Sequence, residues 1–149
     1  MANAPDWNQA PRVPERGPTD AAGFAEEVQA AGTPVVLRGQ VADWPLVEAG
    51  RGSSEAFSQA LLAGSPGGKV HYFEGAESMG GRFFYSDDLQ GFNFERRETP
   101  FADFLAQLCA LEQGGPARHL YAGAIRVPET APALLARYPL TIERPSLSR

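Results

Sequence analysis

The sequence predicts an α+β fold, because helix and strand patterns alternate irregularly along a single chain of 149 residues. Hydrophobic residues make up 43% of the chain and charged residues 21%, which is typical of an ordinary globular domain. The chain has neither the regular β-α-β order nor the Gly-x-Gly-x-x-Gly motif of a dinucleotide-binding fold. The predicted strands are too few to close a barrel, so we expect a sheet with open edges.

Helix caps and apolar spacing predict the helices of this fold. They run from Asp20 (after a cap at Thr19) to Ala31, from a cap at Ser53 or Ser54 to Gly64, from Thr99-Pro100 to Gly114, and from Pro128 to Leu135. The third helix is the clearest, because its apolar residues recur at positions i, i+3, i+4 and i+7 and therefore share one face. These residues are Phe101, Phe104, Leu105 and Leu108. We expect this face to contribute to the hydrophobic core.

β-branched and aromatic residues predict strands between the helices. The strands cover residues 34–38, 69–73, 82–85 and 118–122. A glycine-bearing connection joins the second strand to the third, which predicts a hairpin. Residues 39–52 are predicted to be a loop, and residues 91–94 to be irregular or extended chain. Residues 1–18 carry several prolines and are expected to form a flexible arm ahead of a domain at 19–149.

Charge and hydropathy limit the partners that the chain can have. A formal net charge of −5 argues against a nucleic-acid-binding surface. The only adjacent basic pair, Arg96-Arg97, lies between Glu95 and Glu98 and is interpreted as a solvated surface pair. No apolar run approaches the roughly 20 residues of a membrane helix, and the N-terminus lacks a secretory pattern. We expect a cytoplasmic protein that binds neither nucleic acid nor membrane.

The residues alone predict no complete catalytic or metal site. A non-haem iron site needs two imidazoles and a carboxylate on one face, often as His-x-Asp on a strand. His71 and His119 do not begin that motif, since Phe73 and Tyr121 stand two residues later. Cys109 is the only cysteine, which excludes an internal disulfide and favours a buried structural thiol. We therefore assign no catalytic residue and no metal ligand.

Several segments nevertheless stand in a characteristic order. They are Pro34–Gly39 followed by Trp44-Pro45, Arg82–Asp87 followed by Phe92–Phe94, Phe101–Leu105, and Arg118–Tyr121. This order resembles the cupin-like, Jumonji-C-type domains over roughly residues 20 to 147. In the general character of its sequence, the chain is similar to bacterial cupin-like proteins of unassigned substrate. In layout it is similar to the asparaginyl hydroxylase that acts on hypoxia-inducible factor.

The resemblance implies a double-stranded β-helix, or jelly roll, and an oxygenase that uses Fe(II), O₂ and 2-oxoglutarate on a protein or small-molecule substrate. Tyr121 matches a position whose phenol helps to hold the distal carboxylate of 2-oxoglutarate, which suits an O–H donor. Tyr85 and Asp87 match positions on the substrate side of the pocket. The structural alternative for Tyr121 is a strand tyrosine packed on the core.

The resemblance also implies that the iron site lies further along the chain. In the family, the His-x-Asp motif, a partner for the cosubstrate and a last histidine follow the stretch matched by Arg144–Leu147. We therefore expect residues 1–149 to form an incomplete jelly roll, inactive by itself and without a cofactor of its own. A fragment, a truncated gene product and a half-domain with a partner are the alternatives.

A second interpretation is a non-catalytic binding or assembly module that pairs with another chain. Aromatic residues at positions 83 and 84 of a predicted strand, and at position 92 of the irregular or extended segment, would be uncovered in such a module. Open sheet edges and uncovered aromatic side chains favour self-association.

Overall fold

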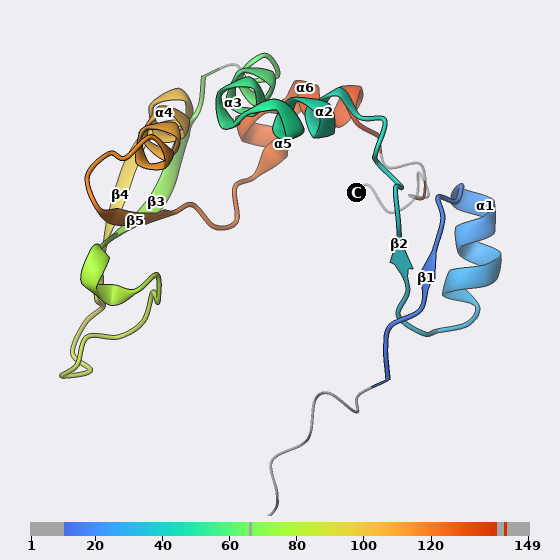
Figure 1. Ribbon diagram of the computed structural model, residues 1–149, viewed down its shortest axis with the longest axis horizontal. Helices are drawn as coiled ribbons and strands as arrows, with labels where there is room; N and C mark the ends of the chain where they lie inside the picture. The colour runs from blue at the N-terminus through green and yellow to red at the C-terminus, as the bar shows by residue number, and fades with distance from the viewer. Residues whose placement is uncertain (1–10, 66, 140–141, 143–149) are drawn as a thin grey trace, which may run out of the picture. The chain divides into compact units, whose positions relative to one another are not determined.

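The computed structural model describes residues 11–65, 67–139 and 142, which fall into two compact units (Figure 1). Among the described residues, the first unit contains 11–43 and 142, and the second contains 44–65 and 67–139. The described part combines helices with small sheets, which agrees with the predicted α+β class. The segment at 143–149, after which the resemblance places the iron ligands, lies outside the described residues.

The first unit contains a short pair of parallel strands. β1 (Glu15–Arg16) pairs with β2 (Val36–Leu37), and the Arg38 guanidinium forms an ion pair with Glu15 at 2.6 Å. β2 is shorter than the strand predicted at 34–38. Of the predicted N-terminal arm, residues 1–10 lie outside the described part of the chain.

A helical segment connects these two strands. It begins as α1 (Ala21–Gly23) and continues as the π-helical turn η2 (Phe24–Gln29). The predicted helix is confirmed over most of its length, but its cap is Asp20 rather than Thr19. The Asp20 carboxylate accepts a hydrogen bond from the Gly23 N–H at 2.8 Å, because it lies one turn ahead of that donor.

Two consecutive helices open the second unit. α2 spans Pro45–Gly52 and α3 spans Ser54–Leu62. The loop predicted at residues 39–52 is therefore wrong in its second half. Trp44 is extended, and the fixed φ of Pro45 suits the first position of a helix, which explains why α2 begins there.

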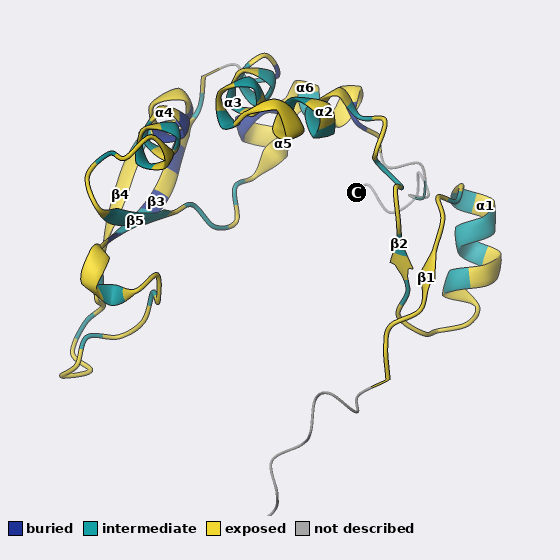
Figure 2. Cartoon of the chain, viewed as in Figure 1, coloured by how far each residue is buried: buried dark blue, intermediate teal, exposed yellow. Residues whose placement is uncertain are grey.

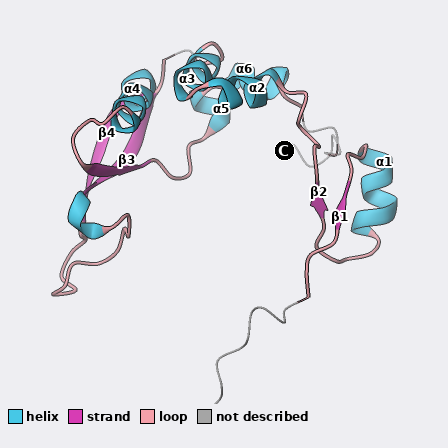
Figure 3. Ribbon diagram, in the orientation of Figure 1, coloured by secondary structure: helices cyan, strands magenta, loops and turns pink. Residues whose placement is uncertain are grey.

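A three-stranded antiparallel sheet with the order β4-β3-β5 follows (Figure 1), and Figure 3 draws the strands in magenta. β3 spans Lys69–Ala76, β4 spans Phe94–Pro100 and β5 spans Arg118–Tyr121. β3 lies between the other two strands, so β4 and β5 form the edges of the sheet. Successive side chains point to opposite faces. Val70 and Tyr72 therefore occupy one face, and Phe73 occupies the other.

The hairpin predicted between residues 69–73 and 82–85 is wrong. β3 pairs instead with β4, whose central run of charged residues gives no strand signal in the sequence. A 3-10 turn, η3 (Glu77–Met79), and left-handed backbone at Gly80 and Gly81 lead the chain out of β3 into a loop.

The side chain of Asn93 holds this loop together. Its Oδ1 accepts a hydrogen bond from the Phe84 N–H at 2.9 Å, and its Nδ2 donates to the Arg82 carbonyl at 2.8 Å. Between Tyr85 and Phe92 there is an isolated antiparallel bridge. Side-chain bonds of this kind offer the backbone an alternative to a ladder, which explains a loop where a strand was predicted.

α4 (Phe101–Glu112) packs beside β3 and β4 (Figure 1). The predicted helix is confirmed, but its predicted start at Thr99-Pro100 is wrong. Thr99 belongs to β4 and is paired with Val70. The Phe101 N–H donates to the Gly68 carbonyl at 2.9 Å, so the sheet satisfies this terminal donor in place of a threonine cap.

The hydrophobic core of the second unit lies where β3 meets α4 (Figure 2). Its buried members are Val70, Tyr72, Phe101, Phe104 and Leu105. The Tyr72 and Phe104 rings lie 5.3 Å apart, a distance that is favourable for tilted aromatic rings. This core confirms three of the four predicted positions on α4, whereas Leu108 is 37% exposed.

The last described helices replace the single one predicted from Pro128 to Leu135. α5 spans Val127–Thr130 and α6 spans Pro132–Arg137, and Pro132 has no N–H to continue the first into the second. After α6, the buried Tyr138 lies against Trp44 with ring centroids 5.2 Å apart.

None of the described helices is long and apolar enough to cross a membrane. A cytoplasmic location stays a prediction.

Replacing Phe104 tests the core. We expect Phe104→Ala to lower the free energy of unfolding by about 3–5 kcal/mol, or to abolish a cooperative transition, because it leaves a cavity under β3. Leu108→Ala on the same helix removes a partly exposed side chain and should cost about 1 kcal/mol. Urea unfolding followed by circular dichroism measures both, and equal losses would contradict this core.

Replacing Ser53 tests the cap of α3. The Ser53 Oγ accepts a hydrogen bond from the Ala56 N–H at 3.1 Å, so Ser53→Ala should lower the free energy of unfolding by about 1 kcal/mol. Ser54→Ala, one residue later in the helix, should change it little. The same urea unfolding experiment compares the two variants. If Ser54→Ala lowered the free energy of unfolding more than Ser53→Ala, the cap would belong to Ser54.

Candidate functional site

Aromatic side chains gather on the face of the β4-β3-β5 sheet that points away from the α4 core. Phe73 is in register with Tyr121 of β5, and Gly75 with Phe94 of β4, so these residues share one face. The loop between β3 and β4 contributes further rings. We call this surface the aromatic face; it consists of Phe73, Phe83, Tyr85, Phe92, Phe94 and Tyr121.

The rings of the aromatic face form a continuous chain of contacts. Phe73 lies at the centre, 4.6 Å from Phe94 and 6.1 Å from Tyr121 between ring centroids. Phe83 lies 5.6 Å from Tyr121, and Phe92 lies 4.9 Å from Phe94. Phe73, Phe83 and Phe94 are half-buried, whereas Phe92 and Tyr121 are exposed. The surface therefore combines an ordered aromatic floor with accessible rings.

Tyr121, the predicted 2-oxoglutarate residue, is 52% exposed at the end of β5. Its ring folds back over Gly123, where an added Cβ would lie 2.7 Å from the phenol oxygen. The α4 core does not include Tyr121. This position, outside the α4 core and half exposed, disfavours the alternative of a core tyrosine.

The two predicted substrate residues differ in their surroundings. Tyr85 belongs to the aromatic face and stacks on Phe92 with ring centroids 5.4 Å apart. Asp87 lies exposed in the turn that follows. Its neighbour Asp88 accepts hydrogen bonds from the Ser86 hydroxyl at 2.6 Å and the Gln90 N–H at 3.0 Å, and the Ser86 bond lowers the pKa of Asp88. The substrate roles of Tyr85 and Asp87 stay predictions.

The sequence did not single out Arg96 as part of this surface. Its guanidinium carbon lies 5.3 Å from the ring centroid of Phe92 and 5.8 Å from that of Phe73, within the range of a cation–π contact. Arg96 is exposed, as predicted for a solvated surface pair. Its place over the rings follows from the register of β4 on β3, which the sequence does not reveal.

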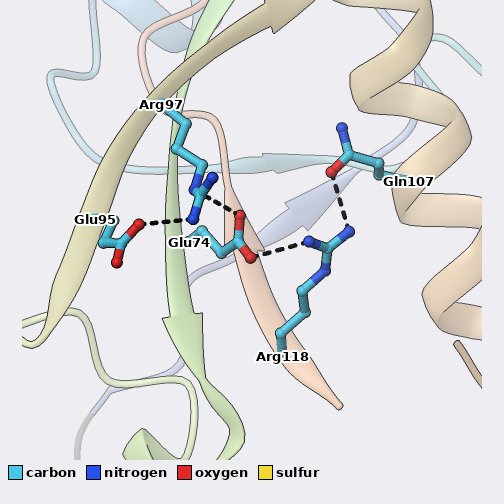
Figure 4. A network of polar contacts seen from close by, with 5 residues as sticks. All are labelled: Glu74, Glu95, Arg97, Gln107 and Arg118. Carbon is cyan, nitrogen blue, oxygen red and sulfur yellow. Dashed lines mark hydrogen bonds and ion pairs between the residues drawn. The ribbon is translucent and has the colours of Figure 1, made fainter. Parts of the chain in front are cut away.

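The opposite face of the sheet carries a polar network at the end of β3 (Figure 4). The Glu74 carboxylate lies 2.9 Å from the guanidinium of Arg97 and 2.9 Å from that of Arg118. Arg97 also reaches Glu95 at 2.7 Å, and Arg118 donates to Gln107 of α4 at 3.0 Å. The network thus connects all three strands to α4. An open hollow of about 490 Å³ adjoins it.

The described residues do not fit an iron site. His71 is in register with Glu98, and His119 with Gly75, four residues further along β3. At about 3.3 Å per residue, the imidazoles are separated by roughly 13 Å along the strand and cannot share one ion. Among the described residues there is no group of three or more His, Cys, Asp or Glu side chains that could hold a metal.

Cys109 lies between α3 and α4 rather than in this surface. It is half-buried, not fully buried as predicted, and its Sγ lies 3.4 Å from the Ser58 Oγ.

Comparison with known proteins identifies the family of the chain. Residues 21–147 match the family model described as a cupin-like domain. No curated protein and no solved structure matches the chain. The specific relationship to the asparaginyl hydroxylase stays a prediction. Because the matched segment covers most of the 149 residues, the chain belongs to the cupin-like domain family, which includes Fe(II)- and 2-oxoglutarate-dependent oxygenases.

Proposed function

We propose that residues 21–147 form part of a cupin-like domain of the Fe(II)/2-oxoglutarate oxygenase type, with the aromatic face lining its cosubstrate and substrate side. The observation that carries this proposal is the position of Tyr121, on the aromatic face and accessible rather than in the α4 core. The family match supports the domain type. The order of the resembling segments supports the narrower kinship with asparaginyl hydroxylases.

The aromatic face has properties suited to such a site. A phenol O–H donates a hydrogen bond to a carboxylate, and apolar rings around it strengthen that bond when the surface is covered and water is excluded. Tyr85 extends the same surface toward the exposed turn with Asp87, where a substrate could be contacted. Ionised Asp87 would favour a substrate with hydrogen-bond donors or positive charge.

This proposal assigns no iron ligand among the described residues. Because His71 and His119 are too far apart to share an ion, the metal ligands of an active domain would have to come from other residues. We therefore propose that the described part supplies the cosubstrate and substrate surface of a jelly roll, and that it is catalytically inactive by itself.

A second candidate function is an assembly module that pairs with another chain. The exposed rings Phe84, Tyr85 and Phe92 and the open strand β4 favour it. Exposed aromatic clusters and unpaired strand edges commonly mark interaction surfaces.

The first test measures turnover. Purified protein of residues 1–149, supplied with Fe(II), ascorbate and 2-oxoglutarate, should form no succinate above a protein-free control, because the described residues assemble no three-ligand metal site. A known 2-oxoglutarate oxygenase serves as the positive control. Succinate formation proportional to protein concentration, and abolished by a chelator, would overturn the proposed inactivity.

The second test measures cosubstrate binding. Saturation-transfer NMR with 2-oxoglutarate should show contacts to the protein, and Tyr121→Phe should weaken binding about tenfold, as expected for a lost hydrogen bond to a charged group. Tyr85→Phe is the matched control and should leave binding unchanged. Equal affinities for the wild-type protein and Tyr121→Phe would refute the role of the phenol.

A further inference from the structure

The backbone groups at the outer edge of β4 can be identified from its pairing with β3. The Phe101 N–H donates to the Gly68 carbonyl, one step beyond the Lys69–Pro100 pair. Hydrogen-bonded positions alternate along an antiparallel pair. The odd-numbered residues of β4 therefore point their N–H and C=O groups toward β3, and Phe94, Arg96 and Glu98 point theirs outward. Pro100, which lacks an N–H, also falls in the outward series, as expected at a sheet edge.

This edge is accessible. β4 has β3 as its only neighbouring strand in the part of the chain that the structure describes. The four consecutive charged residues of the strand, Glu95, Arg96, Arg97 and Glu98, are all exposed. Charged side chains on an edge strand ordinarily discourage pairing. A partner strand must therefore bring opposite charges against them.

The charge order Glu-Arg-Arg-Glu can satisfy that condition with a second copy of itself. An antiparallel pair centred on Arg97 places Arg96 of each copy directly opposite Glu98 of the other, on the side of the aromatic face. In this register each outward N–H faces a carbonyl acceptor on the other copy. The Arg96 N–H faces the Glu98 carbonyl, the Glu98 N–H faces the Arg96 carbonyl, and the Phe94 N–H faces the Pro100 carbonyl. The two aromatic faces then lie on the same side of one continuous sheet.

The competing registers are less favourable. Centring the pair between Arg96 and Arg97 sets Glu95 against Glu98 and sets the two arginines against each other, which are like-charge pairs. A pair centred on Arg96 brings the Arg96 guanidinium groups of the two copies together, although in each copy this group lies over aromatic rings. Centring it on Arg97 also brings two guanidinium groups together, but each is already compensated by Glu74 at 2.9 Å and Glu95 at 2.7 Å.

We propose that β4 is a homodimerisation edge, at which two copies of this chain join antiparallel strands in the register centred on Arg97. This inference deepens the second candidate function, the assembly module, and does not depend on the cosubstrate role of Tyr121. Glu98 is suited to the contact, because its carboxylate remains 41% exposed while it also pairs with Lys69 at 2.7 Å. The Lys69 hydrogen bond lowers the pKa of Glu98 from its ordinary value.

A charge-swap cycle tests the register. Glu98→Arg and Arg96→Glu each set like charges opposite one another at two symmetric positions, and each should raise the dimer dissociation constant at least about tenfold. The double variant Arg96→Glu/Glu98→Arg restores opposite charges and should recover most of the wild-type affinity. Glu112→Arg on α4, an equal change of charge away from β4, should leave the affinity unchanged. Sedimentation velocity over a range of concentrations measures the dissociation constant, and circular dichroism confirms that each variant is folded.

A backbone variant tests the strand pairing itself. Arg96→Pro removes an outward N–H while leaving the hydrogen bonds toward β3 in place, and it should weaken dimerisation as the single charge swaps do.

The proposal is overturned if the wild-type protein is monomeric at every concentration, or if Glu98→Arg and Arg96→Pro dimerise as the wild type does. Failure of the double variant to recover affinity overturns the register. Saturation-transfer NMR with 2-oxoglutarate on Glu98→Arg separates this inference from the proposed oxygenase-type surface, because Glu98 pairs with Lys69 and the phenol of Tyr121 lies away from β4 on β5.

Discussion

The alternation of side chains along β3 is the constraint on which the second unit depends. β3 pairs with β4 over residues 69–75 and with β5 over residues 73–76, so its side chains must serve the two faces of the sheet. Val70 and Tyr72 take the face toward α4, where full burial of such a side chain is worth roughly 1.5–3 kcal/mol. Phe73 takes the other face, and the rings of the loop and of β5 gather around it. The core and the candidate site are thus the two sides of one strand.

The same alternation gives different roles to charged residues that look equivalent in the sequence. Arg97 lies on the α4 side and compensates Glu74, a half-buried carboxylate that would be costly without partners. Its neighbour Arg96 lies on the other side, over the rings of the aromatic face. Glu98, on the same side as Arg96, is held by Lys69 at the far end of the strand. A run of four charges is therefore divided between a structural network, an aromatic surface and an open edge.

Local signals predicted α3 and α4, but they missed α2, which was predicted to be a loop. The apolar spacing of α4 and a serine cap at 53 or 54 are visible in the sequence, because each depends on residues within one or two turns; the structure assigns the cap to Ser53. β4 is not visible, because charged residues carry no period-two apolar pattern and its strand identity comes from pairing with β3. For the site, family resemblance pointed to Tyr121 and Tyr85. The contact between Phe73 and Arg96 could not be predicted, since only the register of β4 on β3 brings them together.

The face and the edge of the sheet impose compatible requirements. The hydrogen bond that we propose between Tyr121 and a cosubstrate carboxylate would gain most if the aromatic face were covered, because a hydrogen bond to a charge is stronger where water is excluded. Pairing at β4 extends the sheet sideways and leaves that face open, since hydrogen bonds between strands run in the plane of the sheet. A dimer formed at β4 would therefore not occupy the surface that a jelly roll must enclose. It would instead place the two aromatic faces side by side in one sheet. A segment that covers one aromatic face would then also contact the edge of the other. Covering the aromatic face, rather than completing the edge, is thus the step that would turn this surface into an oxygenase pocket.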